Sequence, residues 1–165
     1  MTPPTTPSIY IDPALDAYRT SASTYISHRP SEQLVGILCA AVILHKGRVL
    51  LIQRAADDDY PNVWEETGLR ASAGTNVLGE FKYDNGLLPP SDSSRRGKWT
   101  IFIFRAIVDD ESSELEIKLD PNEHRVHLWA TREEIQDDSC GDVKLDWISV
   151  NQKRAILEAF DEVER

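Results

Sequence analysis

Two apolar runs rich in β-branched residues, residues 34–44 and 49–53, constrain the fold of this chain more than any other feature. The segment His45-Lys46-Gly47-Arg48 separates them, and Gly47 suits a tight turn because glycine adopts positive φ without strain. The pattern predicts a β-hairpin. Because the first run is apolar without strict alternation, its strand is expected inside a sheet, with both faces covered.

Further strand and helix signals lie on both sides of this hairpin. Residues 77–83, 98–108 and 125–130 have the composition of strands, the last of these is expected to be the final strand, and a shorter strand is predicted at residues 115–119. Helix starts are indicated by Asp12-Pro13 and by the capping-box spacing of Thr131 with Glu134 and Ser149 with Gln152. The first helix is expected to end at Pro30, and the last to bury Ala155, Ile156, Ala159, Phe160 and Val163. Together these signals predict an α/β fold, a mixed sheet flanked by helices.

Length and composition favour one globular unit. With 165 residues, 41% of them hydrophobic, the chain can build one core, so residues 13–165 are predicted to form a single domain. Residues 1–12 begin with a Pro- and Thr-rich stretch and are expected to be a disordered tail. Cys39 lies in an apolar run and Cys140 in a polar loop, which gives little support to a disulfide or zinc site and predicts a buried structural role for Cys39.

The charge balance limits the possible partners. A net charge of -10 opposes binding to nucleic acid or to an anionic membrane surface. No apolar run approaches the roughly 20 residues of a membrane span, and the N-terminus lacks the pattern of a signal peptide, so a cytoplasmic location is expected. A small phosphorylated substrate remains compatible with this charge because a metal held by carboxylates reverses the local sign. The sequence does not specify the oligomeric state.

Residues 61–69 form a junction that matches the two ends of one sequence motif, and the middle of that motif is missing. Glu65-Glu66-Thr67-Gly68-Leu69 resembles the end of the Nudix hydrolase signature, G-x5-E-x7-R-E-U-x-E-E-x-G-U with U apolar. The segments Gln53-Arg54-Ala55 and Pro61-Asn62-Val63-Trp64-Glu65 resemble those that precede the signature in many members. Glu65 therefore matches either flank, whereas the signature's glycines, early Glu and Arg-Glu pair have no counterpart.

A second match follows in the expected order. The segment from Glu123 to Trp129 is similar to the Glu-His segment that leads into the family's last strand, so the resemblance covers roughly residues 34–136. It implies a Nudix-like mixed sheet flanked by helices, with the signature helix largely deleted. The implied activity is magnesium-dependent cleavage of the pyrophosphate bond in nucleoside diphosphate derivatives, which are small nucleotide-like substrates.

The resemblance also implies roles for individual residues. Glu65, Glu66 and Glu123 would be magnesium ligands, Glu66 and Glu123 the catalytic residues, and Arg54 a substrate-binding residue at a strand end. Each also has a plain alternative as a solvated surface side chain. His124 and His127 are three apart in a predicted strand, so alternation puts them on opposite faces and argues against a shared metal site.

The junction leaves too little chain for the signature helix. The residues between Trp64 and Gly68 cannot form the roughly three helical turns that would project carboxylates at i and i+3 or i+4. Impaired or absent activity is therefore predicted, and one sheet face is expected to be bare. Two alternatives remain open: a non-catalytic binding or interaction domain, and a shortened splice form or mistaken gene model of an active Nudix hydrolase.

Overall fold

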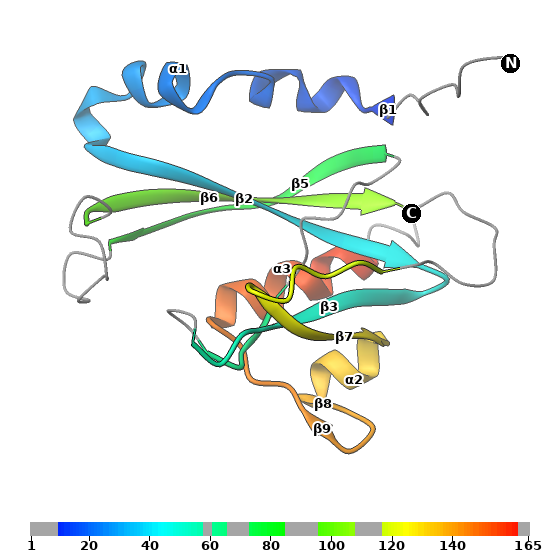
Figure 1. Ribbon diagram of the computed structural model, residues 1–165. Helices are drawn as coiled ribbons and strands as arrows, with labels where there is room; N and C mark the ends of the chain where they lie inside the picture. Colours follow the sequence, from blue (N-terminus) through cyan, green and yellow to red (C-terminus); the bar gives the residue numbers. More distant parts are fainter. Residues whose placement is uncertain (1–9, 58–60, 66–72, 85–95, 108–116, 162–165) are drawn as a thin grey trace, which may run out of the picture.

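A computed structural model describes residues 10–57, 61–65, 73–84, 96–107 and 117–161 (Figure 1). Within these residues a mixed sheet of seven strands runs in the order β1-β5-β6-β2-β3-β4, with β7 also paired to β3. The strands are β1 Tyr10–Ile11, β2 Leu34–His45, β3 Arg48–Arg54, β4 Trp64–Glu65, β5 Ala73–Asp84, β6 Lys98–Ile107, β7 His124–Ala130, β8 Ser139–Cys140 and β9 Val143–Lys144. The helices are η1 Pro13–Tyr18, α1 Ala22–Ser27, η2 Pro30–Glu32, α2 Arg132–Gln136 and α3 Val150–Asp161. This architecture confirms the predicted mixed sheet flanked by helices.

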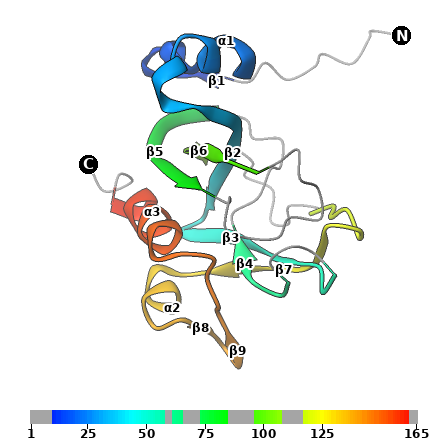
Figure 2. The same cartoon turned by 90° about the vertical axis from the view of Figure 1, so that its left-hand side faces the viewer.

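The β2–β3 hairpin connects two layers of strands. Its central turn residues, Lys46 and Gly47, have φ values of 48° and 72°, as a type I′ turn requires. The pairing of β2 with β3 covers Leu44–Val49 and His45–Arg48, while β2 pairs in parallel with β6 along its length. Figure 2 shows the result: β2, β5 and β6 form one layer, and β3, β4 and β7 form the other.

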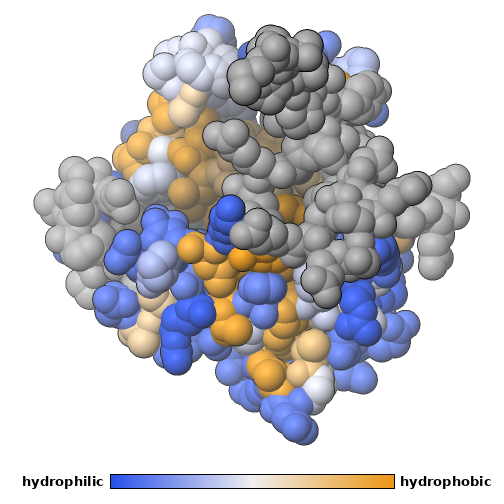
Figure 3. Space-filling view, turned by 45° about the vertical axis from the view of Figure 1, so that its right-hand side comes forward, coloured by the Kyte–Doolittle hydropathy of each residue, from blue (hydrophilic) through white to orange (hydrophobic). Residues whose placement is uncertain are grey.

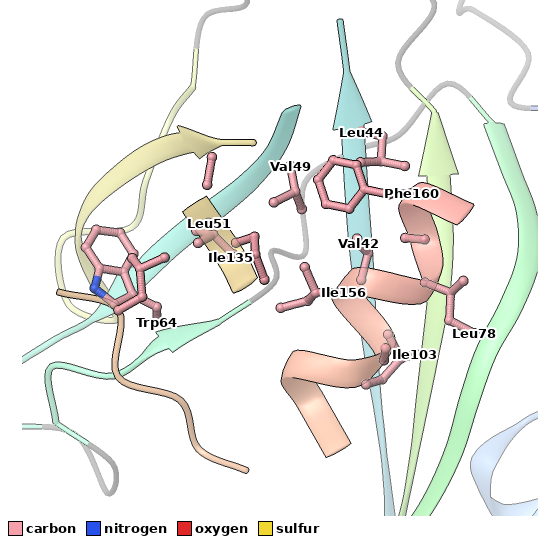
Figure 4. Packing of buried hydrophobic residues seen from close by; sticks show 14 residues of the cluster. Val42, Leu44, Val49, Leu51, Trp64, Leu78, Ile103, Ile135, Ile156 and Phe160 are labelled. Carbon is pink, nitrogen blue, oxygen red and sulfur yellow. The ribbon is translucent and has the colours of Figure 1, made fainter. Parts of the chain in front are cut away.

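The main hydrophobic core lies where α3 packs against both layers (Figure 4). Val42 of β2 and Leu51 of β3 point toward this helix and are fully buried, as is Ile156 on the helix itself. Its predicted apolar stripe is confirmed for Ala155, Ile156, Ala159 and Phe160, whereas Val163 lies outside the described residues. The apolar periodicity of the C-terminal helix thus predicted which of its side chains pack against the two layers of strands.

Near the hairpin turn, the opposite face of β2 and β3 is also buried. Ile43 and Leu50 have no exposed surface, and Ile52 is 3% exposed. Val35 and Leu38, in the N-terminal half of β2, are 45% and 44% exposed, so the expectation of a bare sheet face is wrong only near the turn and stays a prediction elsewhere. On the side of the molecule shown in Figure 3, hydrophobic side chains gather in the middle of the view, with hydrophilic ones beside them.

The N-terminal helices cover part of the face formed by β2, β5 and β6. The predicted single helix is instead divided into η1, α1 and η2, because Ser21 caps a new helix and its Oγ accepts from Thr24 N at 3.1 Å. Tyr25 is buried against Phe102, and its hydroxyl donates to Glu80 Oε1 at 3.2 Å. These contacts fix α1 to the sheet.

Several smaller predictions meet different outcomes. The Thr131 capping box is confirmed, with Glu134 N donating to Thr131 Oγ1 at 3.2 Å. Residues 117–119 are not in a strand, and β8 and β9 follow β7, so residues 125–130 are not the last strand. Cys39 is exposed rather than buried, so the expected burial of this residue is wrong. The proposed disordered tail, residues 1–12, lies outside the described residues up to residue 9, but its end was predicted wrongly, because Tyr10 and Ile11 form β1 and pair with β5. Among described helices, none is long and apolar enough to span a membrane.

Candidate functional site

Strand β4 places the two junction residues on opposite faces of the sheet. Glu65 pairs with Ile52 and Trp64 pairs with Gln53 in antiparallel register, and side chains alternate along a strand. Trp64 is therefore 3% exposed in the main core, whereas Glu65 faces the other side. Glu65, which matches either flank of the motif, lies on the strand that precedes the missing segment.

The carboxylate of Glu65 is held by two side chains from neighbouring strands. Arg54 Nη1, at the end of β3, donates to Glu65 Oε2 at 2.9 Å. His124 Nε2, at the start of β7, lies 3.0 Å from Glu65 Oε1. The three side chains are 24%, 17% and 17% exposed for Arg54, Glu65 and His124, so they form a mostly buried polar cluster.

A register shift brings His124 into this cluster. Val126 pairs with Gln53 and His124 with Arg54, so one extra residue of β7 lies between two adjacent residues of β3. Such a bulge redirects a side chain that strict alternation would place elsewhere. Paired residues share a face, and Ile52 pairs with His127, so the prediction of opposite faces for the two histidines is wrong across the bulge.

The hydrogen bonds define what the cluster can do chemically. An ionised carboxylate accepts hydrogen bonds only, so His124 Nε2 must carry the proton it shares with Glu65. Both oxygens of Glu65 are then engaged by N–H donors, one of them the always-charged guanidinium of Arg54. The cluster consists of one anion, one cation and one imidazole, arranged around a single carboxylate.

The other predicted site residues are placed differently. Glu66 lies outside the described residues. Glu123 is exposed in the turn before β7, where its backbone N donates to Asp120 O at 3.1 Å and its backbone O accepts from Ala55 N at 2.9 Å. The structure thus brings Arg54 and Glu65 together, sets Glu123 next to His124 in the chain, and leaves the proposed roles of all four predicted residues as predictions.

Sequence reasoning gave His124 no part in the site. The signal for it was present in the Glu-His segment that starts at Glu123, but the expected alternation separated its side chain from the other candidates. The bulge that redirects it depends on how β7 pairs with β3.

The residues described here do not fit a magnesium centre. Mg²⁺ requires oxygen ligands in near-octahedral geometry. Among the side chains that the structure describes, no three of His, Cys, Asp or Glu gather as metal ligands would. Glu65 already directs both oxygens at nitrogen donors, and a guanidinium beside it opposes a second cation.

Hydrogen bonds from the C-terminal helix α3 hold β4 on its core side. Gln152 of α3 is 6% exposed, and its Nε2 donates to Trp64 O at 3.2 Å while its Oε1 accepts from Ile148 N at 3.0 Å. The capping role predicted for Ser149 is confirmed, since its Oγ accepts from Gln152 N at 3.1 Å. The strand that carries Glu65 is therefore held from the core side by the C-terminal helix.

Asp138, in the loop before β8, also helps to hold β4 through hydrogen bonds to other side chains. Its Oδ1 accepts from Lys153 Nζ of α3 and from Trp147 Nε1, both at 2.6 Å. The hydrogen bond from Lys153, followed by that from Trp147, lowers the pKa of Asp138. Trp147 in turn forms an isolated β-bridge with Trp64, which connects Asp138 to β4.

Comparisons with known proteins yield structural similarity alone. No family model matches the sequence, and no curated protein matches it significantly. A MutT protein from Methanosarcina mazei Go1 has a TM-score of 0.49 at 18% identity, covering 78% of this chain and 94% of that one. A Nudix hydrolase from Nitrosomonas europaea has a TM-score of 0.47 at 15% identity, over 78% and 90%. The Nudix domain of Shewanella oneidensis NrtR, solved with ADP ribose, has a TM-score of 0.44 at 12% identity, over 88% and 100%.

Proposed function

We propose that this chain is a Nudix-type domain, related to magnesium-dependent hydrolases of nucleoside diphosphate derivatives, that hydrolyses such compounds weakly or not at all. The relationship is supported by the two motif ends that meet at Glu65-Glu66 and by the later Glu123 segment, in the expected order. The loss of activity is supported by one observation: both carboxylate oxygens of Glu65 are engaged by Arg54 and His124.

The chemistry explains why this observation matters. Cleavage of a pyrophosphate bond requires a metal to neutralise developing charge and a positioned water as nucleophile. Glu66 and Glu123 are the remaining candidates for magnesium ligands and catalytic residues, with Arg54 for contact to a substrate phosphate. Two carboxylates, without the helix that would order a third, give little control over the geometry of metal, water and substrate.

A hydrolysis assay tests this proposal. The purified chain is incubated with a panel of nucleoside diphosphate derivatives, with and without magnesium, and product is measured by chromatography. We expect turnover near background in both conditions. Robust magnesium-dependent turnover that Glu66→Gln abolishes, and that Glu158→Gln on the exposed side of α3 leaves unchanged, would overturn the proposal.

A repaired chain tests the relationship itself. Inserting a family-type segment between Glu65 and Glu66, with Pro-Gly-Gly, the early Glu and the Arg-Glu pair, is expected to restore magnesium-dependent hydrolysis, because the helix would then place carboxylates one turn apart. A repaired protein that folds and binds magnesium but hydrolyses none of the panel would favour the alternative of a binding domain. The genomic reading frame between the codons for Glu65 and Glu66 tests the alternative of a shortened form.

A further inference from the structure

We infer that the N-terminal half of β2 is a contact between two copies of this chain, which pair there as antiparallel strands about a two-fold axis at Leu38. The contact joins the mixed sheets of the two copies edge to edge. Assembly of this kind is independent of the proposed activity, because none of its residues belongs to the polar cluster of Arg54, Glu65 and His124.

The edge of β2 is open along residues 35–41. Within the described chain, β3 pairs with β2 only at Leu44 and His45, and farther along the same edge β3 pairs with β4 instead. Figure 1 shows β2 and β3 diverging from their turn. Residues 35–41 all retain exposed surface, and the adjacent Leu38 and Cys39, whose side chains lie on opposite faces, are both exposed. Exposure on both faces of one strand indicates an open edge.

The backbone groups along this edge are placed to pair with another strand. In a two-residue hairpin the residues that flank the turn exchange both backbone hydrogen bonds, so the N–H and C=O of His45 point toward β3. Alternation along β2, whose register with β6 is unbroken from residue 36 to 44, turns those of Ile37, Cys39 and Ala41 to the same edge. In the part of the chain that the structure describes, no hydrogen bond joins these outward groups to another segment.

The composition of this edge differs from that of strands β5 and β7. Natural sheets protect open edges with charged side chains, and β5 carries exposed Glu80, Lys82 and Asp84 while β7 carries exposed Arg125. Residues 34–44 of β2 contain no charged residue and no proline. A long apolar edge without such protection favours the addition of another strand.

Charge and symmetry select a second copy as the added strand. Each chain has a net charge of -10, so two copies repel each other except through a surface without charge, which this edge provides. Antiparallel pairing about Leu38, the midpoint of residues 35–41, sets each open residue opposite another open residue. Leu38 then lies opposite its own counterpart, and Ile37 exchanges hydrogen bonds with Cys39 of the second copy. A two-fold contact of this kind closes at two chains.

Sedimentation equilibrium with a charge substitution tests this inference. The unmodified chain is expected to dimerise reversibly. Leu38→Lys should raise the dissociation constant by about tenfold or more, because two ammonium groups would lie directly opposite each other. Val126→Lys is the matched control: Val126 on β7 is 45% exposed, against 44% for Leu38, and its substitution should leave the dimer unchanged. A chain that stays monomeric up to about 1 mM, or a dimer that Leu38→Lys does not weaken, overturns the inference.

A disulfide test checks the register and does not depend on the folding of Leu38→Lys. In the proposed pairing the two residues at position 38 form a non-hydrogen-bonded pair with Cα atoms about 4.5 Å apart, within reach of a disulfide. Leu38→Cys in a chain that also carries Cys39→Ser should therefore give a covalent dimer on air oxidation. Val126→Cys in the same background should give little, as should Cys39 in the unmodified chain, because it is offset from its counterpart by two residues. Equal cross-linking at positions 38 and 126, or none at position 38, overturns the inference.

Discussion

Trp64 and Glu65 are neighbours in β4, but they belong to two regions with different physical character. The core region, made of Trp64 with Gln152 and Trp147, is apolar and closed by hydrogen bonds to the C-terminal helix. The polar cluster, made of Glu65 with Arg54 and His124, holds its charges among side chains that keep partial contact with water. On one face of this two-residue strand, Trp64 packs in the hydrophobic core. On the other face, Glu65 carries the charged group of the polar cluster.

This difference bears on the proposal that the chain keeps a Nudix-type fold without a complete catalytic motif. The junction joins the motif's two ends beside a tryptophan whose packing and backbone bonds fix β4 from the core side. Stability comes from apolar burial, which the junction preserves, whereas the proposed loss of activity concerns the carboxylates that pyrophosphate cleavage needs. Substitutions in the two regions should therefore separate stability from ligand binding.

The largest effect is expected from Trp64→Ala, which removes a 3% exposed tryptophan of the core region. Deleting a buried aromatic side chain costs about 3–5 kcal/mol of unfolding free energy, because the space it leaves does not close completely. Urea denaturation followed by fluorescence measures this change. A loss below about 1 kcal/mol would show that β4 contributes little to the fold.

The next largest effect is expected from Gln152→Ala. This change leaves Trp64 O and Ile148 N without their side-chain partner, and leaving buried polar groups unpaired costs about 1–3 kcal/mol. Thermal denaturation measures the loss. The adjacent exposed Asn151→Ala serves as a control and should lie within about 0.5 kcal/mol of the unmodified chain.

In the polar cluster, Glu65→Gln should reduce stability by less than either core substitution. Glutamine keeps the size of Glu65 and retains one acceptor for Arg54, and partial contact with water reduces the cost of removing the charge. Urea denaturation at low and high salt checks this, because an ion pair weakens with ionic strength. A loss as large as that of Trp64→Ala would remove the contrast between the two regions.

The smallest expected effect concerns pH and Asp138. Its pKa is lowered in the folded state, so it contributes stability above the ordinary aspartate pKa of about 3.9 and loses that contribution as pH falls through the lower folded value. Asp138→Asn should therefore flatten the fall in melting temperature within this acidic window. An unchanged pH profile would show that the contacts of Asp138 with Lys153 and Trp147 add no pH-dependent stability.

Local patterns predicted the elements better than their pairing. The turn at Gly47 and the capping box at Thr131 were found correctly because short-range sequence determines them. The division of the N-terminal helix was missed because a cap at Ser21 competes with helical spacing over the longer segment. Cys39 was expected to be buried because an apolar run does not reveal which of its side chains other elements cover.

The candidate site shows the same limit. Arg54 and Glu65 were each singled out from the sequence, one by its place at a strand end and the other by the motif. Their contact depends on the pairing of β3 with β4, and the approach of His124 depends on the bulge in β7. Local sequence patterns do not determine either strand register, because each pairing joins segments that are distant in the sequence.

The β2–β3 hairpin also bears on how quickly this chain folds. Its pairing covers Leu44–Val49 and His45–Arg48, whereas β2 pairs along its length with β6, about 60 residues further along the chain. Closing such a loop loses chain entropy before any parallel pair is formed. A topology with this much long-range pairing is expected to fold in milliseconds to seconds, with the turn at Lys46-Gly47 formed first and the parallel pairing of β2 with β6 setting the rate.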